Sequence, residues 1–205
     1  MATIPFHQRV AEWVRHTDHS YVYRVALADV PHTASAPWPE LCVVVCDAAN
    51  LFDVEQLLPD LPPIIKKYVR DGNLAFLAAA GEEWVFRSVA ILGPRLYPVH
   101  GYPLALTARD VFLEAAETHP AWRGKGVAPG MLRVTADELL ARGYTCGMMT
   151  IATDNMASCR AAEKGGARRI GTLSARRHFG RWRAEFAPAL AVPTGAGEED
   201  SRRAA

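Results

Sequence analysis

A positively charged, glycine-rich segment stands just before a stretch with helical periodicity. Arg123, Gly124, Lys125 and Gly126 precede the apolar pattern of residues 131–144. Glycines let the chain turn so that successive backbone N–H groups converge on one anion, and the dipole of the following helix adds to the attraction. The segment therefore predicts a phosphate-binding loop.

Two common phosphate-binding motifs do not fit this loop. The dinucleotide fingerprint needs a third glycine where Pro129 stands, and a Walker loop needs Ser or Thr where Gly126 follows Lys125. Pro129 is compatible with a first helical turn, since its missing N–H would have no partner there. What remains is a cradle in which the backbone itself holds the phosphate.

The loop and a second motif together resemble a known family. Arg123–Ala128 is similar to the (Gln/Arg)-x-x-Gly-x-(Gly/Ala) pyrophosphate loop of the GCN5-related N-acetyltransferases (GNAT superfamily), in which Pro120 and Trp122 also have counterparts. Residues 155–166 resemble the second signature of the family, an Asn followed by Glu-Lys-x-Gly. The first residues of the two motifs are 32 positions apart, which suits one helix and one strand between them.

The resemblance implies an acyl-coenzyme A ligand, most simply acetyl-coenzyme A, and no metal. Backbone N–H groups of the loop would hold the pyrophosphate, Lys125 would face the ribose phosphate, and Asn155 would bond the cofactor arm. A bulge in the preceding strand would free backbone groups for the pantetheine amides. The implied cofactor-binding residues are Ala116, Thr118, Arg123, Gly124, Lys125, Gly126, Val127, Ala128, Asn155 and Ser158.

Transfer of an acyl group to an amine requires a base that removes the ammonium proton. The strand predicted before the loop offers Glu114, Glu117 and Asp110. Glu114 ranks first, because the family often carries a base nine residues before the loop. Glu117 ranks second, since it falls on the other strand face unless a bulge reverses the alternation, and Asp110 ranks third. The alternative for each is a solvated carboxylate.

The proton donor for the leaving thiolate is left open. The family usually has a tyrosine where this chain has Ala162. Ser158 is the third candidate catalytic residue, because a subset of the family places a hydroxyl there. The alternatives are water, Cys159, Tyr102 and Tyr144. The missing tyrosine also motivates a second hypothesis, a catalytically silent domain that binds acyl-coenzyme A as a sensor or partner.

Composition bounds the function classes. The chain has 205 residues, half of them apolar, and a net charge of +1, which is typical of one soluble domain and disfavours nucleic-acid or anionic-membrane binding. Four cysteines without CxxC or zinc-like spacing predict free thiols and no metal. With no signal-peptide pattern at the N-terminus, we expect a cytoplasmic protein. Its expected partner is a small-molecule or protein amine, and a homodimer is compatible with the sequence.

The residues that carry the chemistry must be positioned by alternating strands and helices. The hydrophobic patterns predict a helix at 4–17, a helix in two pieces at 50–73, and helices at 131–144 and 154–166. The prolines of residues 95–108 predict a loop there. The predicted strands cover 21–30, 40–48, 74–80, 83–92, 110–119, 145–152, 167–174 and 178–187.

We therefore expect an α/β (α+β) fold like that of the GNAT superfamily. It would contain a mixed, largely antiparallel twisted sheet of about six to seven strands, flanked by helices and splayed at a central strand to hold acyl-coenzyme A. Residues 1–190 would form one domain, with the cofactor-binding core at 110–186 and a poorly matched part at 1–70. Residues 191–205 are predicted to be a disordered tail.

Overall fold

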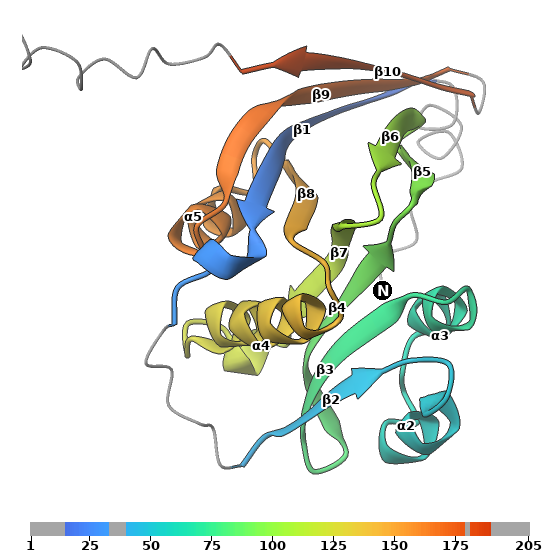
Figure 1. The fold of residues 1–205 in the computed structure, drawn as a ribbon, viewed down its shortest axis with the longest axis vertical. Coiled ribbons are helices and arrows are strands. Elements are labelled where there is room, and N and C mark those ends of the chain that lie inside the picture. Colours follow the sequence, from blue (N-terminus) through green and yellow to red (C-terminus); the bar gives the residue numbers. More distant parts are fainter. Residues whose placement is uncertain (1–14, 33–39, 179–180, 190–205) are drawn as a thin grey trace, which may run out of the picture.

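The computed structural model describes residues 15–32, 40–178 and 181–189 (Figure 1). The strands are β1 (Arg15–Ala26), β2 (Cys42–Cys46), β3 (Leu74–Ala80), β4 (Glu83–Leu92), β5 (Arg95–Val99), β6 (Tyr102–Leu106), β7 (Asp110–Thr118), β8 (Cys146–Ala152), β9 (Arg168–His178) and β10 (Arg181–Pro188). The helices are α2 (Leu51–Leu57), α3 (Pro63–Arg70), α4 (Val127–Ala141) and α5 (Met156–Lys164), with 3-10 turns η1 (Leu27–Asp29) and η2 (Pro120–Trp122).

Most predicted elements are confirmed, with shifts at their ends. The two-piece helix at 50–73 is α2 and α3, separated by the prolines that were expected to break it. The strand predicted at 21–30 begins earlier, at Arg15, and ends at Ala26 in a 3-10 turn. The helix predicted at 4–17 lies outside the described residues except for 15–17, which belong to β1, and the tail at 191–205 lies outside them too.

Eight strands form one mixed sheet in the order β10-β9-β1-β8-β7-β4-β3-β2. Strands β7 and β8 run parallel, whereas the other neighbouring pairs are antiparallel. The expected mixed, largely antiparallel sheet is thus confirmed. It has eight strands and not the expected six to seven, because all eight segments predicted as strands join the one sheet, with β1 between β8 and β9.

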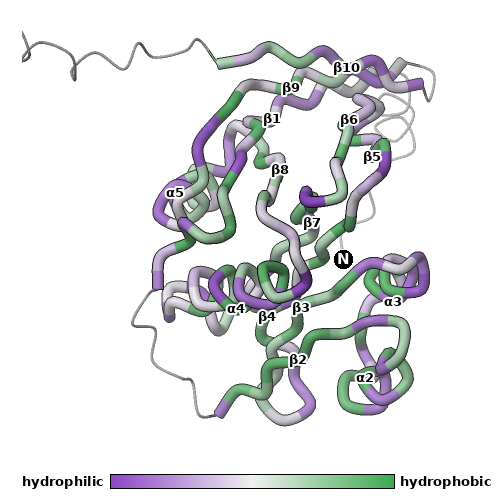
Figure 2. The backbone as a smooth tube through the Cα atoms, in the orientation of Figure 1, coloured by the Kyte–Doolittle hydropathy of each residue, from purple (hydrophilic) through white to green (hydrophobic). Residues whose placement is uncertain are grey.

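Helices cover both faces of the sheet, with one hydrophobic core on each face. Helices α2 and α3 pack on the face that carries Leu77, Val89 and Phe112, while α4 and α5 pack on the face of Phe76 and Val111 (Figure 1). Strand β3 is apolar throughout because it is covered on both sides. By contrast, Figure 2 shows hydrophilic and hydrophobic residues alternating along the edge strand β10.

The prediction of a loop at 95–108 is wrong. Residues 95–106 form a separate hairpin of β5 and β6, in which Pro98 lies opposite Pro103. His100 and Gly101 both have positive φ, 48° and 83°, as a tight two-residue hairpin turn requires. Prolines are tolerated because a two-stranded sheet consists only of edges, where a missing N–H costs no ladder bond. The same prolines had suggested a loop.

Candidate active site

A cleft of about 1350 Å³ opens where strands β7 and β8 separate. Their ladder spans only Asp110–Phe112 on β7 and Cys146–Met148 on β8, within the described part of the chain. Beyond it, the facing backbone edge of β7 lines the cleft from Leu113 to Thr118. The splayed central strand expected from the sequence is therefore present.

A β-bulge reshapes strand β7 beside the cleft. Glu114 pairs with Val89 and Glu117 with Arg87, so that Ala115 and Ala116 both stand opposite a single residue of β4. Ala115 has a φ of +54°, which is rare for a residue with a side chain. The extra residue reverses the alternation, and therefore Glu114 and Glu117 lie on the same face of the sheet.

Glu114 is held by two tyrosine hydroxyl groups. Tyr68 on α3 donates to Oε1 at 3.2 Å, and Tyr97 on β5 donates to Oε2. The two hydroxyl oxygens lie 3.2 Å apart. Burial raises the pKa of Tyr97 far above that of a free tyrosine, and its bonds to Glu114 and Tyr68 act in the same direction. Tyr97 therefore stays protonated and remains a donor.

Sequence reasoning missed both tyrosines. Tyr68 lies 46 positions before Glu114 and Tyr97 lies 17 before it, one on a helix and one in the hairpin that was mistaken for a loop. Asn73 helps to place Tyr68: its side chain donates to the Tyr68 carbonyl at 3.0 Å and accepts from the Leu92 N–H at 3.2 Å. Only the alternation of β5 could have indicated which face Tyr97 occupies.

Glu117 and Asp110 are engaged in other interactions. Glu117 lines the cleft, and the Arg87 Nε donates to it at 3.0 Å, so this carboxylate is part of an ion pair. Asp110 does not line the cleft and accepts from the Thr107 N–H at 2.8 Å. Burial alone would raise the pKa of Asp110, but the hydrogen bonds with Thr107 and Cys146 and the charge of Arg24 together outweigh it, and the pKa is lowered. Of the three carboxylates, Glu114 is the one set between neutral donors in the cleft.

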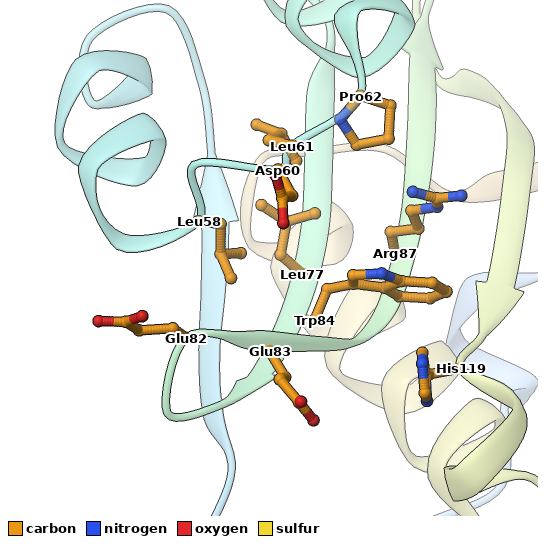
Figure 3. A pocket seen from close by; sticks show the side chains of 10 residues that line it. All are labelled: Leu58, Asp60, Leu61, Pro62, Leu77, Glu82, Glu83, Trp84, Arg87 and His119. Carbon is orange, nitrogen blue, oxygen red and sulfur yellow. The ribbon is translucent and has the colours of Figure 1, made fainter.

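A second, smaller cavity of about 220 Å³ adjoins the cleft across the Arg87–Glu117 ion pair. Figure 3 shows Trp84 between Arg87 and His119. The Arg87 guanidinium lies 4.4 Å from the Trp84 ring centroid, and the His119 ring meets the indole edge-on at 5.0 Å. His119 thus packs beside this cavity, one residue after the end of β7.

The glycine-rich loop has the backbone conformation of an anion cradle. Gly124 and Gly126 have φ of +75° and +78°, and no atom lies within 4 Å of the position that a Cβ would take at either. Conformation, and not space, therefore requires glycine at both positions. Gly126 is the N-cap of α4, so the loop leads directly into a helix N-terminus, where backbone N–H groups face the solvent.

The charged residues of the loop differ in where they point. The Arg123 Nε donates to the Thr118 carbonyl at 3.2 Å, which ties the loop back to the end of β7. The Lys125 ammonium lies 4.7 Å from the ring centroid of Trp122. Lys125 does not line the cleft, whereas the rest of the predicted cradle does: Arg123, Gly124, Gly126, Val127 and Ala128.

The beginning of α5 forms the opposite wall. The Asn155 Oδ1 accepts from the Ser158 N–H at 3.1 Å, so Asn155, and not Asp154, caps the helix. Asn155 and Ser158 both line the cleft, and so does Ala162. Predicted cofactor residues from two distant segments are therefore brought together here.

Among the alternatives for the proton donor, Ser158 alone of the side chains proposed lines the cleft. Cys159 is 2% exposed and packs in the core beneath α5. Tyr102 stacks against Phe186 at 6.0 Å, and Tyr144 packs against the same core as Cys159. None of these three groups lines the cleft, so none is placed to contact a ligand there.

The cleft connects the two faces of the sheet. Trp122, Val127 and Ala128 of the loop region belong to the α4 and α5 face, whereas Tyr68 and Tyr97 belong to the α2 and α3 face. Both groups line the same cleft. A ligand held by the loop can therefore present its end to Glu114 through the split between β7 and β8.

Among residues 15–32, 40–178 and 181–189, no group of three or more His, Cys, Asp or Glu side chains is placed to hold a metal ion. No helix in these ranges is both long and apolar enough to cross a membrane.

Comparison with known proteins identifies the fold. A GCN5-related glucosamine N-acetyltransferase region of a fungal multi-domain β-N-acetylglucosaminidase superposes with a TM-score of 0.56 at 11% identity, covering 81% of this chain and 22% of that one. A conserved protein of unknown function from Staphylococcus epidermidis gives 0.53 at 9% identity, covering 85% and 67%. A protein assigned to the GNAT acetyltransferases from Novosphingobium aromaticivorans gives 0.50 at 15% identity, covering 78% and 63%.

Sequence comparison gives no corresponding match. No protein-family model matches the chain, and no curated protein is similar to it in sequence. The chain also spans less than two thirds of the length of the fungal and Novosphingobium proteins. The shared property is the three-dimensional arrangement: the chain has the fold of the GCN5-related N-acetyltransferases.

Proposed function

We propose that this protein is an N-acyltransferase that transfers the acetyl group of acetyl-coenzyme A to a primary amine by direct attack in a ternary complex. One observation carries the proposal. A single cleft through the split sheet is lined on one face by the cradle at Gly124–Ala128 and on the other by Glu114. An acyl donor held on one face would thus meet an amine on the other.

The residues present fit an acyl-coenzyme A. Two glycines with positive φ and the N-terminus of α4 suit a pyrophosphate, which is anionic and accepts many hydrogen bonds. The unpaired edge of β7 after Phe112 suits the pantetheine amides, which would add to it as a strand does. Asn155 would contribute its amide group from the opposite wall. The thioester would then lie near the bulge at Ala115–Ala116.

Glu114 would accept the proton of the acceptor ammonium. The neutral amine nitrogen then forms a bond to the thioester carbonyl carbon and the carbon–sulfur bond breaks with its electron pair going to sulfur. The nitrogen gives up its second proton to solvent, and an amide results. Tyr68 and Tyr97 are positioning residues in this scheme, because their hydroxyl groups fix both oxygens of the carboxylate. A base held within hydrogen-bond reach of its proton is worth about 10²–10⁴ in rate.

The thiolate requires a proton after the carbon–sulfur bond breaks. Ser158 lines the cleft, and its hydroxyl can donate a hydrogen bond to sulfur while solvent supplies the proton. A thiolate is a moderately good leaving group with a pKa of about 8.5, so a strong acid is not required. This arrangement would take the role of the tyrosine that the family usually has at the position of Ala162.

Two measurements on the purified protein test the proposal. Calorimetry with acetyl-coenzyme A should give a saturable heat, and a thiol-release assay should show turnover that depends on added amine. Absence of binding would exclude the proposal altogether. Tight binding without turnover for any amine in a broad panel would instead support the second candidate, an acyl-coenzyme A sensor, which Ala162 at the usual tyrosine position favours.

A further inference from the structure

The β5–β6 hairpin bridges the two halves of the split sheet on the acceptor face. Its first strand is anchored to one half: the Tyr97 hydroxyl bonds Glu114, and the Tyr97 ring lies 5.2 Å from that of Phe112 on β7. Its turn reaches the other half, where the His100 ring lies 5.7 Å from Trp182 on β10. The hairpin therefore extends from β7 to β10 (Figure 1), and its residues 97–101 line the cleft.

The contact at the turn is close enough to require glycine. A Cβ added to Gly101 would lie 2.5 Å from the Cβ of Trp182, which real structures do not show. Two further contacts flank it, His100 Nδ1 to Asp18 Oδ2 at 3.5 Å and the Tyr102 ring to that of Phe186 at 6.0 Å. The hairpin turn is thus seated on β1 and β10.

We infer that this hairpin is a fixed roof over the acceptor end of the cleft, and that the acceptor is a slender primary amine with an apolar or aromatic body. The inference rests on the proposed transferase function and deepens it. Because both ends of the hairpin are anchored, an acceptor must reach Glu114 beneath it. A folded protein surface or an extended peptide would collide with the hairpin.

The chemistry of the walls supports this class of acceptor. Beneath the hairpin the cleft is lined by the aromatic rings of Tyr68, Tyr97, Phe112 and Trp182. Such rings pack well against an apolar or aromatic body and attract a nearby ammonium group. An amine with a neighbouring carboxylate is disfavoured, because Glu114 and Glu117 would repel it, while Arg87 is already paired with Glu117.

The chain offers a matched pair of variants for the test. Gly101 and Gly81 both have positive φ, +83° and +59°, in hairpin turns, but nothing lies within 4 Å of a Cβ added at Gly81. Gly101→Ala and Gly81→Ala therefore share the backbone strain and differ in the clash with Trp182. The first should loosen the roof, whereas the second should leave the site unchanged.

The experiment measures amine binding and turnover separately. 2-Phenylethylamine, glycine and a hexapeptide with a free N-terminal alanine are titrated calorimetrically into the protein saturated with coenzyme A, and kcat/KM is measured with acetyl-coenzyme A. We expect the wild type to favour 2-phenylethylamine over both others by about 10-fold or more, and Gly101→Ala to reduce the preference over the hexapeptide by about 10-fold. Gly81→Ala should keep the wild-type preference.

The outcomes separate this inference from the proposed function. Selective binding of 2-phenylethylamine without turnover would support the roof and count against the transferase. Equal or tighter binding of the hexapeptide by the wild type would overturn the roof, and so would an unchanged preference in Gly101→Ala or failure of all three amines to bind. If calorimetry detects no binding of acetyl-coenzyme A to the wild type, the transferase proposal is refuted independently of the amine measurements.

Discussion

The hydroxyl group of Tyr97 donates a hydrogen bond to the carboxylate of Glu114, joining the β5–β6 hairpin to the strand that borders the cleft. Tyr68 occupies the other carboxylate oxygen from α3. The candidate base is thus fixed by two elements that approach it from different parts of the fold. The two hydrogen bonds hold the carboxylate in one orientation although a glutamate side chain is flexible, as preorganised catalysis requires.

Mutation of Glu114 and of Glu117 should affect the rate differently, although the bulge places both side chains on one face. Glu114→Gln should lower kcat by about 100-fold or more and remove the acid-side limb of the rate profile, because no carboxylate remains to accept the proton. Glu117→Gln should keep that limb, since this carboxylate is paired with Arg87. Steady-state kinetics across pH, with acetyl-coenzyme A affinity as control, make the comparison. Equal effects of both variants would remove Glu114 as the base.

Stability should fall at alkaline pH because of Tyr97. The pKa of Tyr97 is raised in the folded protein by burial first and by its bond to Glu114 next. A tyrosine in the unfolded chain ionises at about pH 10, so above this pH the folded state binds more protons than the unfolded state and loses stability as pH rises.

Tyr97→Phe should reduce this alkaline loss. Thermal unfolding at about pH 8 and pH 11 should show a smaller drop in Tm for the variant than for the wild type, while Tyr68 contributes in the same direction to both. At the lower pH the variant should be less stable by about 1.5–3 kcal/mol, the value of one hydrogen bond to a charged group. Parallel Tm curves for the two proteins would contradict the assignment.

The cradle should depend on the conformation of Gly126. Gly126→Ala forces a side chain into a φ of +78°, and relief of that strain would turn the N–H groups away from the pyrophosphate. We expect acetyl-coenzyme A affinity to fall by about 10-fold, the value of one hydrogen bond to a charged group. Gly143→Ala is the matched control, since Gly143 has a φ of +89°, equally open space and no place in the cleft. Calorimetry that gives similar affinities for both variants would exclude the cradle.

Asn155 should have two roles that different substitutions separate. Asn155→Ser keeps an N-cap oxygen for the Ser158 N–H, whereas Asn155→Ala removes it and should lower stability by about 1 kcal/mol. Both variants lack the amide that would bond the cofactor arm, so both should bind acetyl-coenzyme A more weakly than the wild type. Denaturant unfolding and calorimetry measure the two effects. Wild-type affinity in Asn155→Ser would restrict this residue to capping.

Local sequence signals were sufficient for most elements. Prolines divided α2 from α3, and the glycines of the loop indicated both the cradle and the start of α4, because these residues act through their own backbone torsions. The helix predicted at 154–166 is α5, and the structure shows Asn155 as its N-cap. Such features require no knowledge of distant residues.

Local signals failed where partners are distant in the chain. The hairpin at 95–106 was mistaken for a loop because of its prolines. Proline is accepted in edge strands, and the sequence alone does not show that these two strands form a separate two-stranded sheet. Similarly, β1 is a strand like others in sequence, but its place between β8 and β9 depends on pairing with residues at least 120 positions away.

The sequence by itself determined that a glycine-rich loop precedes a helix, that a second helix follows it, and that carboxylates stand on the strand before them. Tertiary structure decided the surroundings of each carboxylate. The bulge at Ala115 turned Glu114 and Glu117 to one face, where Arg87 paired with one and Tyr68 and Tyr97 surrounded the other. Torsional preferences are encoded residue by residue, whereas the surroundings of a side chain depend on which distant segments the folded chain brings against it.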